Sequence, residues 1–381
     1  MKSILVSLHV GSNTGYAIGP LELLFYRMAL NLTGGDASRI HFAYPSMSKG
    51  PSTTLPADFS QYLVVDMKGT ESGDHERAAD YVRKHGIDTL FGFDLGVSRP
   101  IYKSLRRAGL RHMISYWGAP MSSVNTGVKR LLKQLSVALS RHGPDHYVFE
   151  SRGMAETAVL GRGIPQGRTS VVYLGVDTAR FRPDAADTLK VYERLSIAPQ
   201  RRIFFYSGHM EPRKGVAVIM EAANRLAGRR GADDWHVLLL GNKGDEHLPH
   251  VALLTEQARD RVTFGGYRSD LDVLQRGCYA AVIASTGWDS FPRSGMEMQA
   301  SGLPVLVSDL RGLRESIEDN GTGLLFPTGD ADALASAMER LLDEPALRDR
   351  LAARARARVE AGFTEDIQLG NLTTLVGRLT A

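Results

Sequence analysis

The sequence predicts an α/β protein made of two doubly wound parallel sheets. Short runs of β-branched and aromatic residues alternate with amphipathic helical stretches along the whole chain. These runs are apolar throughout, as parallel strands are when helices cover both faces of their sheet. They fall into two sets, and 381 residues fit two domains at about 150 residues or more each.

The two sets of strands lie on either side of residues 175–200. Strands of the first set are predicted at residues 3–8, 40–43, 62–65, 89–91, 112–115, 147–149 and 170–173. Strands of the second set are predicted at residues 203–207, 236–240, 262–264, 280–284, 304–308 and 323–326. The polar segment 175–200 reads as a linker. We expect domains over 1–180, joined by a last helix over 364–381, and over 181–363, with a cleft between them.

Composition excludes several classes of protein. With 43% hydrophobic and 23% charged residues, the chain is neither disordered nor collagen-like. Its apolar runs are too short for a membrane-spanning helix, and the first residues do not resemble a secretory signal. Cys278 is the only cysteine, so we expect a buried, inert thiol in a reducing cytoplasm.

Positive charge is concentrated in the first half of the chain. Residues 1–180 hold 21 Lys and Arg against 14 Asp and Glu, and residues 97–144 hold no acidic residue. An anionic partner is therefore expected there. Nucleic acid is not, because only Tyr102, Tyr116 and Trp117 interrupt the basic stretch as aromatic residues.

Residues 128–141 predict an amphipathic helix within this basic stretch. At 3.6 residues per turn, one stripe contains Val128, Leu131, Leu132, Leu135, Ala138 and Leu139. The stripe is flanked by Lys129, Arg130, Lys133 and Arg141. We expect the amino-terminal domain to dock on an anionic membrane surface through these residues. In the alternative, the stripe packs on the amino-terminal sheet.

The loop after the predicted strand 203–207 is a candidate anion site. It contains Gly208, which permits a sharp turn, and Pro212 before the predicted helix 216–226. Arg213 and Lys214 lie where a helix amino end already carries positive potential. Two cations there favour a bound diphosphate or triphosphate, and the alternative is a solvated basic turn.

A second loop carries two carboxylates. Asp289 follows the predicted strand 280–284, and Glu297 lies in the first two turns of the next helix, between Met296 and Met298. A carboxylate pair at the carboxyl end of a strand can hold vicinal hydroxyls of a ribose or a hexose. The alternative for Glu297 is a carboxylate that only interacts with the helix dipole.

Other polar patterns are not expected to carry chemistry. Ser269 with Asp272, and Asp330 with Asp332, read as helix caps, so we expect no metal site. The glycines after the first strand lack the dinucleotide-binding spacing. The isolated histidines His9, His112, His142 and His209 are expected to be surface residues or satisfied core residues.

Three segments together resemble the family 4 retaining glycosyltransferases of the GT-B fold, the group 1 glycosyltransferases. They are residues 171–183, residues 208–215, and Asp289 to Glu297 followed by residues 300–305. The resemblance is clearest over 171–327. It implies two Rossmann-like domains facing a central cleft, the amino-terminal one on the acceptor side and the carboxyl-terminal one on the donor side.

The resemblance also implies residue roles. Glu297 would bind the ribose of a nucleotide sugar, Asp289 the transferred sugar, and Arg213 and Lys214 the diphosphate. The other implied donor-binding residues are Gly208, Tyr267, Arg268, Phe291, Arg293 and Ser294. On the acceptor side it implies a loop with Gly15, Gly19 and Trp117, in which the family's Gly-Gly-x-Glu reads Gly19-Pro20-Leu21-Glu22.

Two residues depart from the family pattern. Asp289 is one methylene shorter than the usual Glu, and Pro292 replaces a frequent Gly and so removes an N–H donor. Both changes fall on the part of the site that the family uses for the donor sugar.

We therefore expect a metal-independent, retaining hexosyltransferase that uses UDP-sugar or GDP-sugar and no cofactor. Its acceptor would be a glycan or lipid-linked glycan of bacterial surface-polysaccharide assembly, at the inner face of the cytoplasmic membrane. The alternatives are a nucleotide-sugar epimerase on the same scaffold and a soluble glycosyltransferase with a small free acceptor. An epimerase needs acid and base residues beside Asp289, and the sequence does not predict them.

Overall fold

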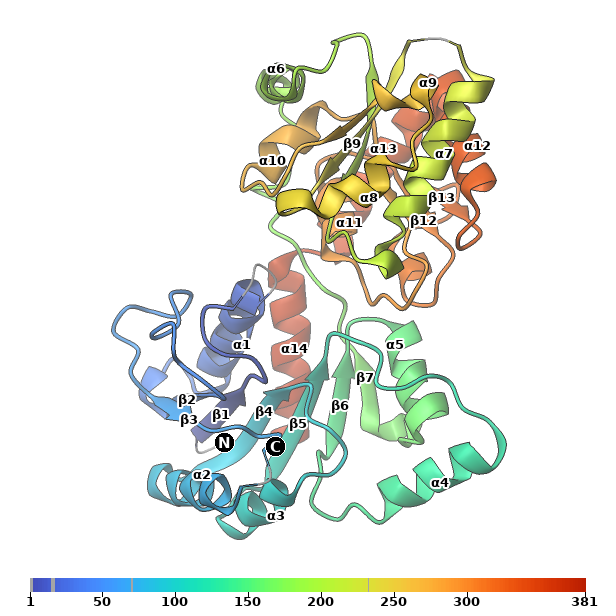
Figure 1. Cartoon of the computed structure of the whole chain (residues 1–381). Helices are drawn as coiled ribbons and strands as arrows, with labels where there is room; N and C mark the ends of the chain where they lie inside the picture. Colours follow the sequence, from blue (N-terminus) through green and yellow to red (C-terminus); the bar gives the residue numbers. More distant parts are fainter. Residues whose placement is uncertain (1–2, 15–17, 70, 232) are drawn as a thin grey trace. The chain divides into compact units, whose positions relative to one another are not determined.

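The computed structural model describes residues 3–14, 18–69, 71–231 and 233–381. The chain forms two units, one of residues 1–173 and 365–381 and one of residues 174–364. Each unit is built on one sheet of parallel strands with helices on both faces (Figure 1). The predicted fold class is confirmed.

Among the described residues, the first unit has a seven-stranded sheet in the order β3-β2-β1-β4-β5-β6-β7. Its strands are β1 (Ser3–Ser7), β2 (Ile40–Tyr44), β3 (Tyr62–Val64), β4 (Ile87–Phe93), β5 (His112–Trp117), β6 (His146–Phe149) and β7 (Thr169–Val171). The chain moves outward from β1 to β3 and then from β4 to β7 on the other side of β1. Each strand predicted for this part of the chain is present.

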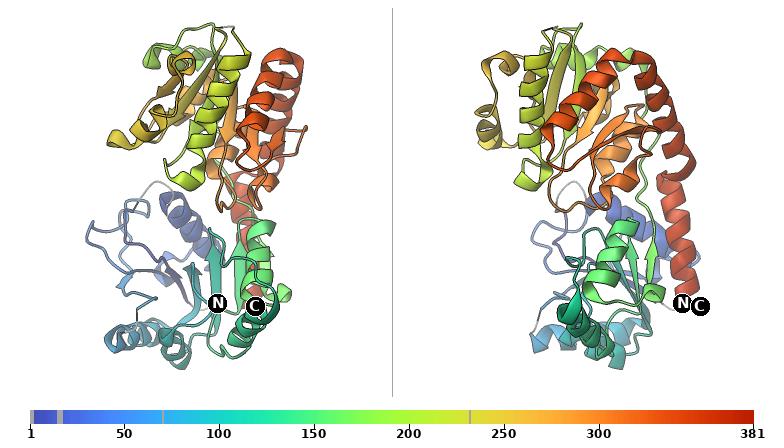
Figure 2. Two further views of the ribbon diagram at one scale, coloured as in Figure 1. Left: turned by 45° about the vertical axis from the view of Figure 1, so that its right-hand side comes forward. Right: turned by 90° about the vertical axis from the view of Figure 1, so that its right-hand side faces the viewer.

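Helices cover both faces of this sheet (Figure 2). On one face, α1 (Ile18–Leu32) lies beside α14 (Glu365–Thr380), and both contribute to one apolar core. On the other face, α2 (Ser72–His85) and α3 (Pro100–Arg107) enclose a second core. Because α14 supplies core residues such as Leu372, the first unit is complete only with residues 365–381.

One helix of this unit does not bury its apolar stripe. The helix α4 (Gly127–Ala138) buries Val137 but exposes the predicted stripe. Its large side chains are between 50% and 77% exposed; they are Val128, Leu131, Leu132, Leu135 and Leu139. The alternative in which this stripe packs on the sheet is therefore wrong.

Among the described residues, the second unit has a six-stranded sheet in the order β10-β9-β8-β11-β12-β13. Its strands are β8 (Arg202–Ser207), β9 (Trp235–Leu240), β10 (Val262–Phe264), β11 (Ala280–Ile283), β12 (Val305–Ser308) and β13 (Gly323–Phe326). These are also the predicted strands. Their apolar side chains form one core on each face of the sheet.

The helices of the second unit divide between these two faces. One core includes side chains from α7 (Val216–Arg229), α9 (Glu256–Arg259), α12 (Ala331–Asp343) and α13 (Pro345–Gly362). The other includes side chains from α6 (Lys190–Leu195), α10 (Leu271–Leu274) and α11 (Arg293–Ala300). The short α5 (Arg152–Glu156) belongs to the first unit and α8 (Leu248–Val251) to the second.

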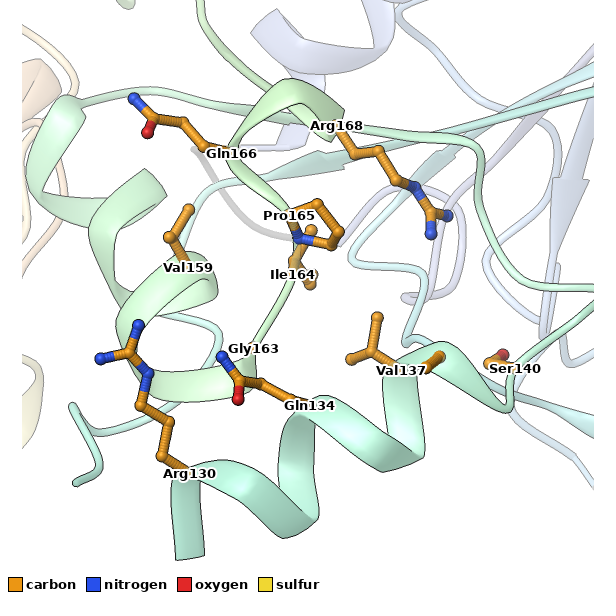
Figure 3. Close-up of a pocket in the computed structure, with 11 residues that line it drawn as sticks. Arg130, Gln134, Val137, Ser140, Val159, Gly163, Ile164, Pro165, Gln166 and Arg168 are labelled. Carbon is orange, nitrogen blue, oxygen red and sulfur yellow. The ribbon is translucent and has the colours of Figure 1, made fainter. Parts of the chain in front are cut away.

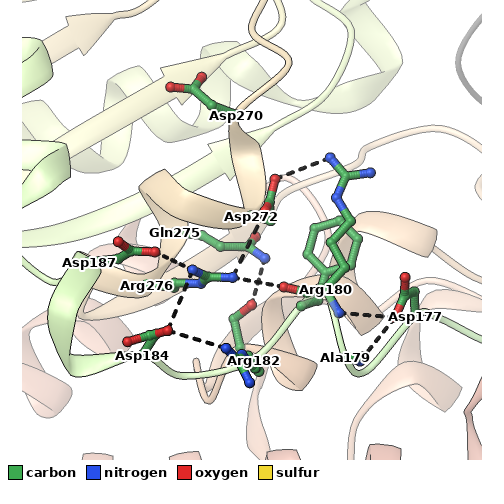
Figure 4. Close-up of polar contacts among 12 residues, drawn as sticks. Asp177, Ala179, Arg180, Arg182, Asp184, Asp187, Asp270, Asp272, Gln275 and Arg276 are labelled. Atoms are coloured by element: carbon green, nitrogen blue, oxygen red, sulfur yellow. Dashed lines mark hydrogen bonds and ion pairs between the residues drawn. The ribbon is translucent and has the colours of Figure 1, made fainter.

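The segment 175–200 is not a linker. It belongs to the second unit, and Val191 in α6 is fully buried in its core. The guanidinium of Arg276 contacts the carboxylate of Asp187 and donates to the carbonyl of Arg180, 3.0 Å away (Figure 4). These polar contacts fasten a proline-containing segment that composition alone assigns to a linker.

The predicted cap formed by Ser269 and Asp272 is also wrong. The helix α10 begins at Leu271 without a side-chain cap. Asp270 instead binds Arg268 and Arg194, and Asp272 lies 3.1 Å from the guanidinium of Arg180. The cap predicted at Asp330 is confirmed, because its carboxylate accepts the N–H of Ala333 at 2.9 Å.

Cys278 is a buried free thiol, as predicted, and burial raises its pKa. In the part of the chain that the structure describes, no helix combines the length and the apolar character needed to cross a bilayer.

Glu22 of the Gly19-Pro20-Leu21-Glu22 run is a buried brace. The residue is 1% exposed, and its carboxylate accepts hydrogen bonds from the hydroxyls of Tyr44, at 2.9 Å, and Ser52, at 2.8 Å. It thereby ties α1 to β2 and to the loop after β2. Both bonds are charge-assisted, so the group contributes more to stability than a neutral pair would.

We predict that Glu22→Ala lowers the free energy of unfolding by about 3 kcal/mol, because it removes both bonds and leaves the buried Tyr44 hydroxyl without its partner. Urea unfolding followed by circular dichroism measures this change. Ser52→Ala removes one of the two bonds to Glu22, together with the bond that the Thr54 N–H donates to the Ser52 hydroxyl, and should cost less, about 2 kcal/mol. Equal stability of Glu22→Ala and the wild type would contradict the brace.

Candidate functional site

Each sheet has one point where its strand order reverses. In the second unit the chain leaves β8 toward β9 and leaves β11 toward β12, on the opposite side. In the first unit the same reversal separates β1 from β4. Ligands of open α/β sheets bind outside the carboxyl ends of the strands at such a point. A ligand site is therefore expected in the loops that follow β8, β11, β1 and β4.

The loop after β8 approaches the end of β11 closely. Pro212–Lys214 forms a separate short 3-10 turn, and α7 begins only after Gly215. Gly215 has a φ of 71°, and a Cβ there would collide with the carbonyl oxygen of Ala284. Arg213 and Lys214 thus precede the helix and are not in its first turn. The left-handed glycine turns this loop onto the neighbouring one.

Lys214 and Asp289 form the central contact of this site. The Lys214 ammonium lies 2.6 Å from Oδ2 of Asp289, whose side chain is 9% exposed. The hydroxyl of Ser285 donates to the same oxygen at 2.9 Å, and the backbone N–H of Ser290 donates to Oδ1 at 3.0 Å. The carboxylate is therefore held by the Lys214 ammonium and two hydrogen bonds at the end of β11.

Arg213 also connects the loop after β8 with the loop after β11. Its guanidinium lies over the ring of Trp288, 4.2 Å from the centroid, and donates to the Trp288 carbonyl at 3.2 Å. Its Nε lies 2.7 Å from Glu211. The carbonyl of Arg213 also accepts the N–H of Thr286 at 2.8 Å. The two loops consequently form one continuous structure with two cations.

The start of α11 adds backbone donors to this region. Pro292 precedes the helix, so the N–H groups of Arg293, Ser294 and Gly295 belong to its first turn, where an α-helix has no partners of its own for them. Such a helix start attracts anions. The proline that replaces a family glycine therefore removes a donor just before the helix and leaves its first turn intact.

Glu297 lies farther along α11 and is buried, with 6% of its surface exposed. Phe291 is also buried, and its ring stacks on Phe363 with centroids 5.6 Å apart. The Arg293 guanidinium donates to the carbonyl of Gly175 at 3.3 Å. These contacts hold the loop between β11 and α11 in place. The side chains of Phe291 and Arg293 therefore contribute to the conformation of this loop.

Three other predicted donor-binding residues follow β8 and β10. Gly208 donates its N–H to Leu240 at 3.1 Å, and a Cβ there would lie 2.8 Å from the hydroxyl of Tyr206. Tyr267 is 60% exposed, with the Lys243 ammonium 5.2 Å from its ring centroid.

The third of them, Arg268, donates two hydrogen bonds to Asp270, at 2.8 and 2.7 Å. The exposed ring of Tyr267, with the Lys243 ammonium over it, is suited to stacking with a nucleotide base. The Arg268 side chain is instead engaged with Asp270.

The first unit has its own pair of titratable groups at the reversal point, which the sequence did not predict. His9 follows β1 and Asp94 follows β4, and Nδ1 of His9 lies 3.6 Å from Asp94. The same nitrogen lies 3.3 Å from the Phe93 carbonyl, which can only accept, so Nδ1 carries the proton. Knowing that the first and fourth strands are neighbours would have predicted this pair.

Burial controls the protonation of both groups. It raises the pKa of Asp94 to about 7, against the opposing effects of the Lys68 charge and the backbone N–H of Gly118. It lowers the pKa of His9, as does the charge of Lys68. Among the described residues, Oδ1 of Asp94 has no hydrogen-bond partner. Near neutral pH, a neutral imidazole thus faces a carboxyl group that is partly protonated.

Two of the three predicted acceptor-side residues, Gly19 and Trp117, lie in the described part of the chain. Gly15 lies outside the described residues. Gly19 lies inside α1, and a Cβ there would lie 3.2 Å from the hydroxyl of Thr54. Trp117 ends β5, and its buried indole N–H has no partner in the described part of the chain. The described residues also contain no group of three or more side chains suited to a metal ion.

Residues 190–358 match the family model for "Glycosyl transferases group 1", which confirms the resemblance over most of the second unit. The phosphatidyl-myo-inositol mannosyltransferase of Mycolicibacterium smegmatis is 33% identical over 193 residues, which cover 49% of this chain and 46% of that protein. The chain spans about half the length of the curated relatives it matches.

Two solved structures show the same fold. A glycosyltransferase from Rickettsia africae gives a TM-score of 0.81 at 17% identity, over 100% of this chain and 99% of that one. Anabaena HepE in complex with UDP gives a TM-score of 0.78 at 17% identity, over 99% of this chain and 100% of that one. The chain therefore has the fold of GT-B glycosyltransferases.

We predict that Asp94→Asn flattens the dependence of stability on pH. Because the pKa of Asp94 is raised on folding, the folded state binds its proton more tightly than the unfolded state. Stability is then lost as pH rises from about 4 to about 7, by at most about 1.4 kcal/mol per pH unit. Urea unfolding at pH 5, 6, 7 and 8 should show that the free energy of unfolding of Asp94→Asn rises relative to that of the wild type as the pH rises.

The exposed Asp58 of the same unit provides the matched control. Asp58→Asn should leave the pH profile parallel to that of the wild type. A parallel profile for Asp94→Asn as well would mean that Asp94 is an ordinary carboxylate.

Proposed function

We propose that this protein, whose residues 190–358 match the group 1 glycosyl transferases, is a retaining glycosyltransferase. It would move a hexose-type sugar from a UDP-sugar or GDP-sugar to a hydroxyl of a glycan or lipid-linked glycan. The observation that carries the proposal is the Lys214–Asp289 pair at the strand-order reversal, beside the start of α11. We place the reaction in the cytoplasm and in the assembly of a bacterial surface polysaccharide.

The cations supply the charge that the reaction needs. As the bond between the anomeric carbon and the diphosphate breaks, negative charge grows on the leaving phosphate. Lys214, Arg213 and the N–H groups at the start of α11 stabilise that charge more strongly in the transition state than in the ground state. The proposed step requires no metal ion, because these groups provide the positive charge.

A diphosphate would take over the contact that Asp289 now makes with Lys214. The ammonium can turn toward the phosphate, because Ser285 and the backbone of Ser290 continue to hold the carboxylate. Asp289 then presents an acceptor to hydroxyl groups of the transferred sugar. Its shorter side chain keeps this acceptor closer to the end of β11 than a glutamate would.

Glu297 is suited to the ribose. It lies one turn into α11, its carboxylate is buried, and a buried carboxylate stabilises hydroxyl donors of a ligand that excludes water. In the proposed retaining step the acceptor oxygen bonds to the anomeric carbon on the face that the diphosphate leaves. The acceptor's proton passes to a phosphate oxygen, so no protein general base is assigned.

The acceptor side is assigned to the first unit, to which Gly15, Gly19 and Trp117 belong. The relative named as a phosphatidyl-myo-inositol mannosyltransferase supports an acceptor with a lipid part. The UDP in the HepE complex supports a nucleoside diphosphate donor.

We predict that UDP or GDP raises the melting temperature of the wild type, whereas Lys214→Ala and Arg213→Ala each weaken this effect. A ligand at 100 times its Kd adds about 2.7 kcal/mol of stability. Loss of one charge-assisted hydrogen bond, about 1.5–3 kcal/mol, corresponds to roughly ten- to a hundredfold in Kd. Thermal-shift assays with UDP, GDP, ADP and their sugars measure the stabilisation of the wild type and its loss in the two variants. The same assays in EDTA test whether nucleotide binding needs a metal ion.

Arg350, an exposed cation of α13, provides the matched control. Arg350→Ala should bind the nucleotide as the wild type does. If none of the nucleotides stabilised the wild type, or if both loop variants bound as tightly as the wild type, the donor site would lie elsewhere.

We predict different effects for the two carboxylates. Glu297→Gln should weaken binding of the bare nucleotide about tenfold or more, because it loses charged acceptors for the ribose. Asp289→Asn should leave that affinity nearly unchanged and mainly lower turnover and discrimination between donor sugars. Titration calorimetry with the nucleotide, and turnover assays with several donor sugars, separate the two.

The reverse pattern would show that the roles are exchanged. Ser285→Ala tests the positioning of Asp289: it removes the 2.9 Å bond to the carboxylate and should lower turnover without changing nucleotide affinity. A nucleotide sugar that is isomerised without any acceptor would indicate an epimerase.

A further inference from the structure

The helix α4 reverses the usual arrangement of a surface helix. An amphipathic helix normally buries its apolar stripe and exposes its polar face. In α4 the stripe from Val128 to Leu139 is exposed, whereas Val137, on the opposite face, is 5% exposed. Side chains four and seven positions apart lie on one face of a helix. Lys133 and Arg130 therefore share the inward face with Val137.

The inward face is held by polar and backbone contacts. Gly163 has a φ of 84°, and a Cβ there would lie 2.6 Å from the side chain of Gln134, so the loop touches the helix directly. The guanidinium of Arg162 donates to the Ser136 hydroxyl at 3.3 Å. The Lys133 ammonium donates to the hydroxyl of Ser122 at 2.6 Å. The outward leucines are thus not needed to attach the helix.

The surroundings of the stripe are basic. Lys129 is exposed on α4 and Arg141 is exposed shortly after the helix ends, and residues 97–144 contain no acidic residue. Of the four cations that the sequence placed as flanks, Arg130 and Lys133 instead lie on the inward face. A partner that fits this surface must be apolar at its centre and anionic at its edge.

A cavity of about 430 Å³ adjoins the helix on the side of Arg130 and Gln134 (Figure 3). Arg130 comes from α4, and Arg168 comes from the opposite wall, in the segment before β7. Nε of Arg130 is buried and has no hydrogen-bond partner among the described residues. The Arg168 guanidinium donates to the carbonyls of Pro144 and Asp145. The volume lies within the range of small-ligand pockets, and the guanidinium of Arg130 favours an anionic headgroup.

We propose that α4 docks the first unit onto a bilayer that contains anionic phospholipid. The leucines of the outward stripe enter the interface between headgroups and acyl chains, and Lys129 and Arg141 contact the anionic headgroups. One lipid phosphate enters the adjoining cavity beside Arg130. A second copy of the chain does not fit this surface, because two identical basic surfaces repel each other.

The test is co-sedimentation of the full chain with vesicles of phosphatidylcholine alone or mixed with phosphatidylglycerol. The wild type should bind only the mixed vesicles, and high salt should release it. Leu131→Gln/Leu135→Gln/Leu139→Gln should bind at least about tenfold more weakly, because it loses the apolar contact.

Two single substitutions separate the roles of the cations. Lys129→Glu should also bind at least about tenfold more weakly, because it reverses an exposed charge. Arg130→Gln should weaken binding to the mixed vesicles without introducing binding to phosphatidylcholine.

Leu189 is 59% exposed in the second unit, and Leu189→Gln is the matched control. It should bind vesicles as the wild type does. Because the replaced leucines are exposed, the triple variant should unfold at the temperature of the wild type, which circular dichroism checks. No binding by the wild type, equal binding to neutral vesicles, or unchanged binding by the triple variant would overturn the proposal.

Two further results complete the test. A dimer in analytical ultracentrifugation that the triple variant abolishes would assign the stripe to self-association and overturn the docking proposal. Vesicle binding is measured without nucleotide and rests on the first unit alone, so its failure would leave the proposed donor site untouched, and the reverse also holds.

Discussion

The doubly wound strand order determines where polar groups can gather in this protein. A parallel sheet buried on both faces needs helices on both faces, so the chain must leave the central pair of strands toward opposite sides. Helices then cannot cover the ends of those two strands. β8 and β11 form this pair in the second unit, and β1 and β4 form it in the first. The Lys214–Asp289 pair lies at one of these uncovered ends and the His9–Asp94 pair lies at the other.

The two uncovered ends are electrostatically different. In the second unit Lys214 and Asp289 form an ion pair, and the aspartate accepts two further hydrogen bonds. An incoming anion can therefore bind the lysine without leaving the carboxylate unpaired. In the first unit burial favours the neutral forms of His9 and Asp94. One end therefore holds an ion pair, whereas burial favours neutral groups at the other.

Sequence patterns predicted the parts of this structure that local chemistry controls. The strands, the cap at Asp330 and the helix that carries Glu297 follow from apolar runs and from residues near each other in the chain. The contacts that were missed join distant residues. Arg276 holds the segment 175–200 to the second unit from almost a hundred residues away, and His9 meets Asp94 only because β1 and β4 are neighbours. The sequence also did not predict whether the apolar stripe of α4 is buried, because the same pattern of residues fits a helix that packs on its own sheet and a helix that binds another surface.

The return of α14 to the first unit has a consequence for how the chain acquires its structure. The second unit is continuous, so it can fold as soon as its residues have been synthesised. The first unit must wait for residues 365–381, because Leu372 and Val376 fill the core against α1. Until then, an apolar face of its sheet stays open to solvent, and its closure joins segments separated by about half of the chain. Such non-local contacts slow folding and prolong the exposure of apolar surface, which makes the newly made first half a natural client of chaperones.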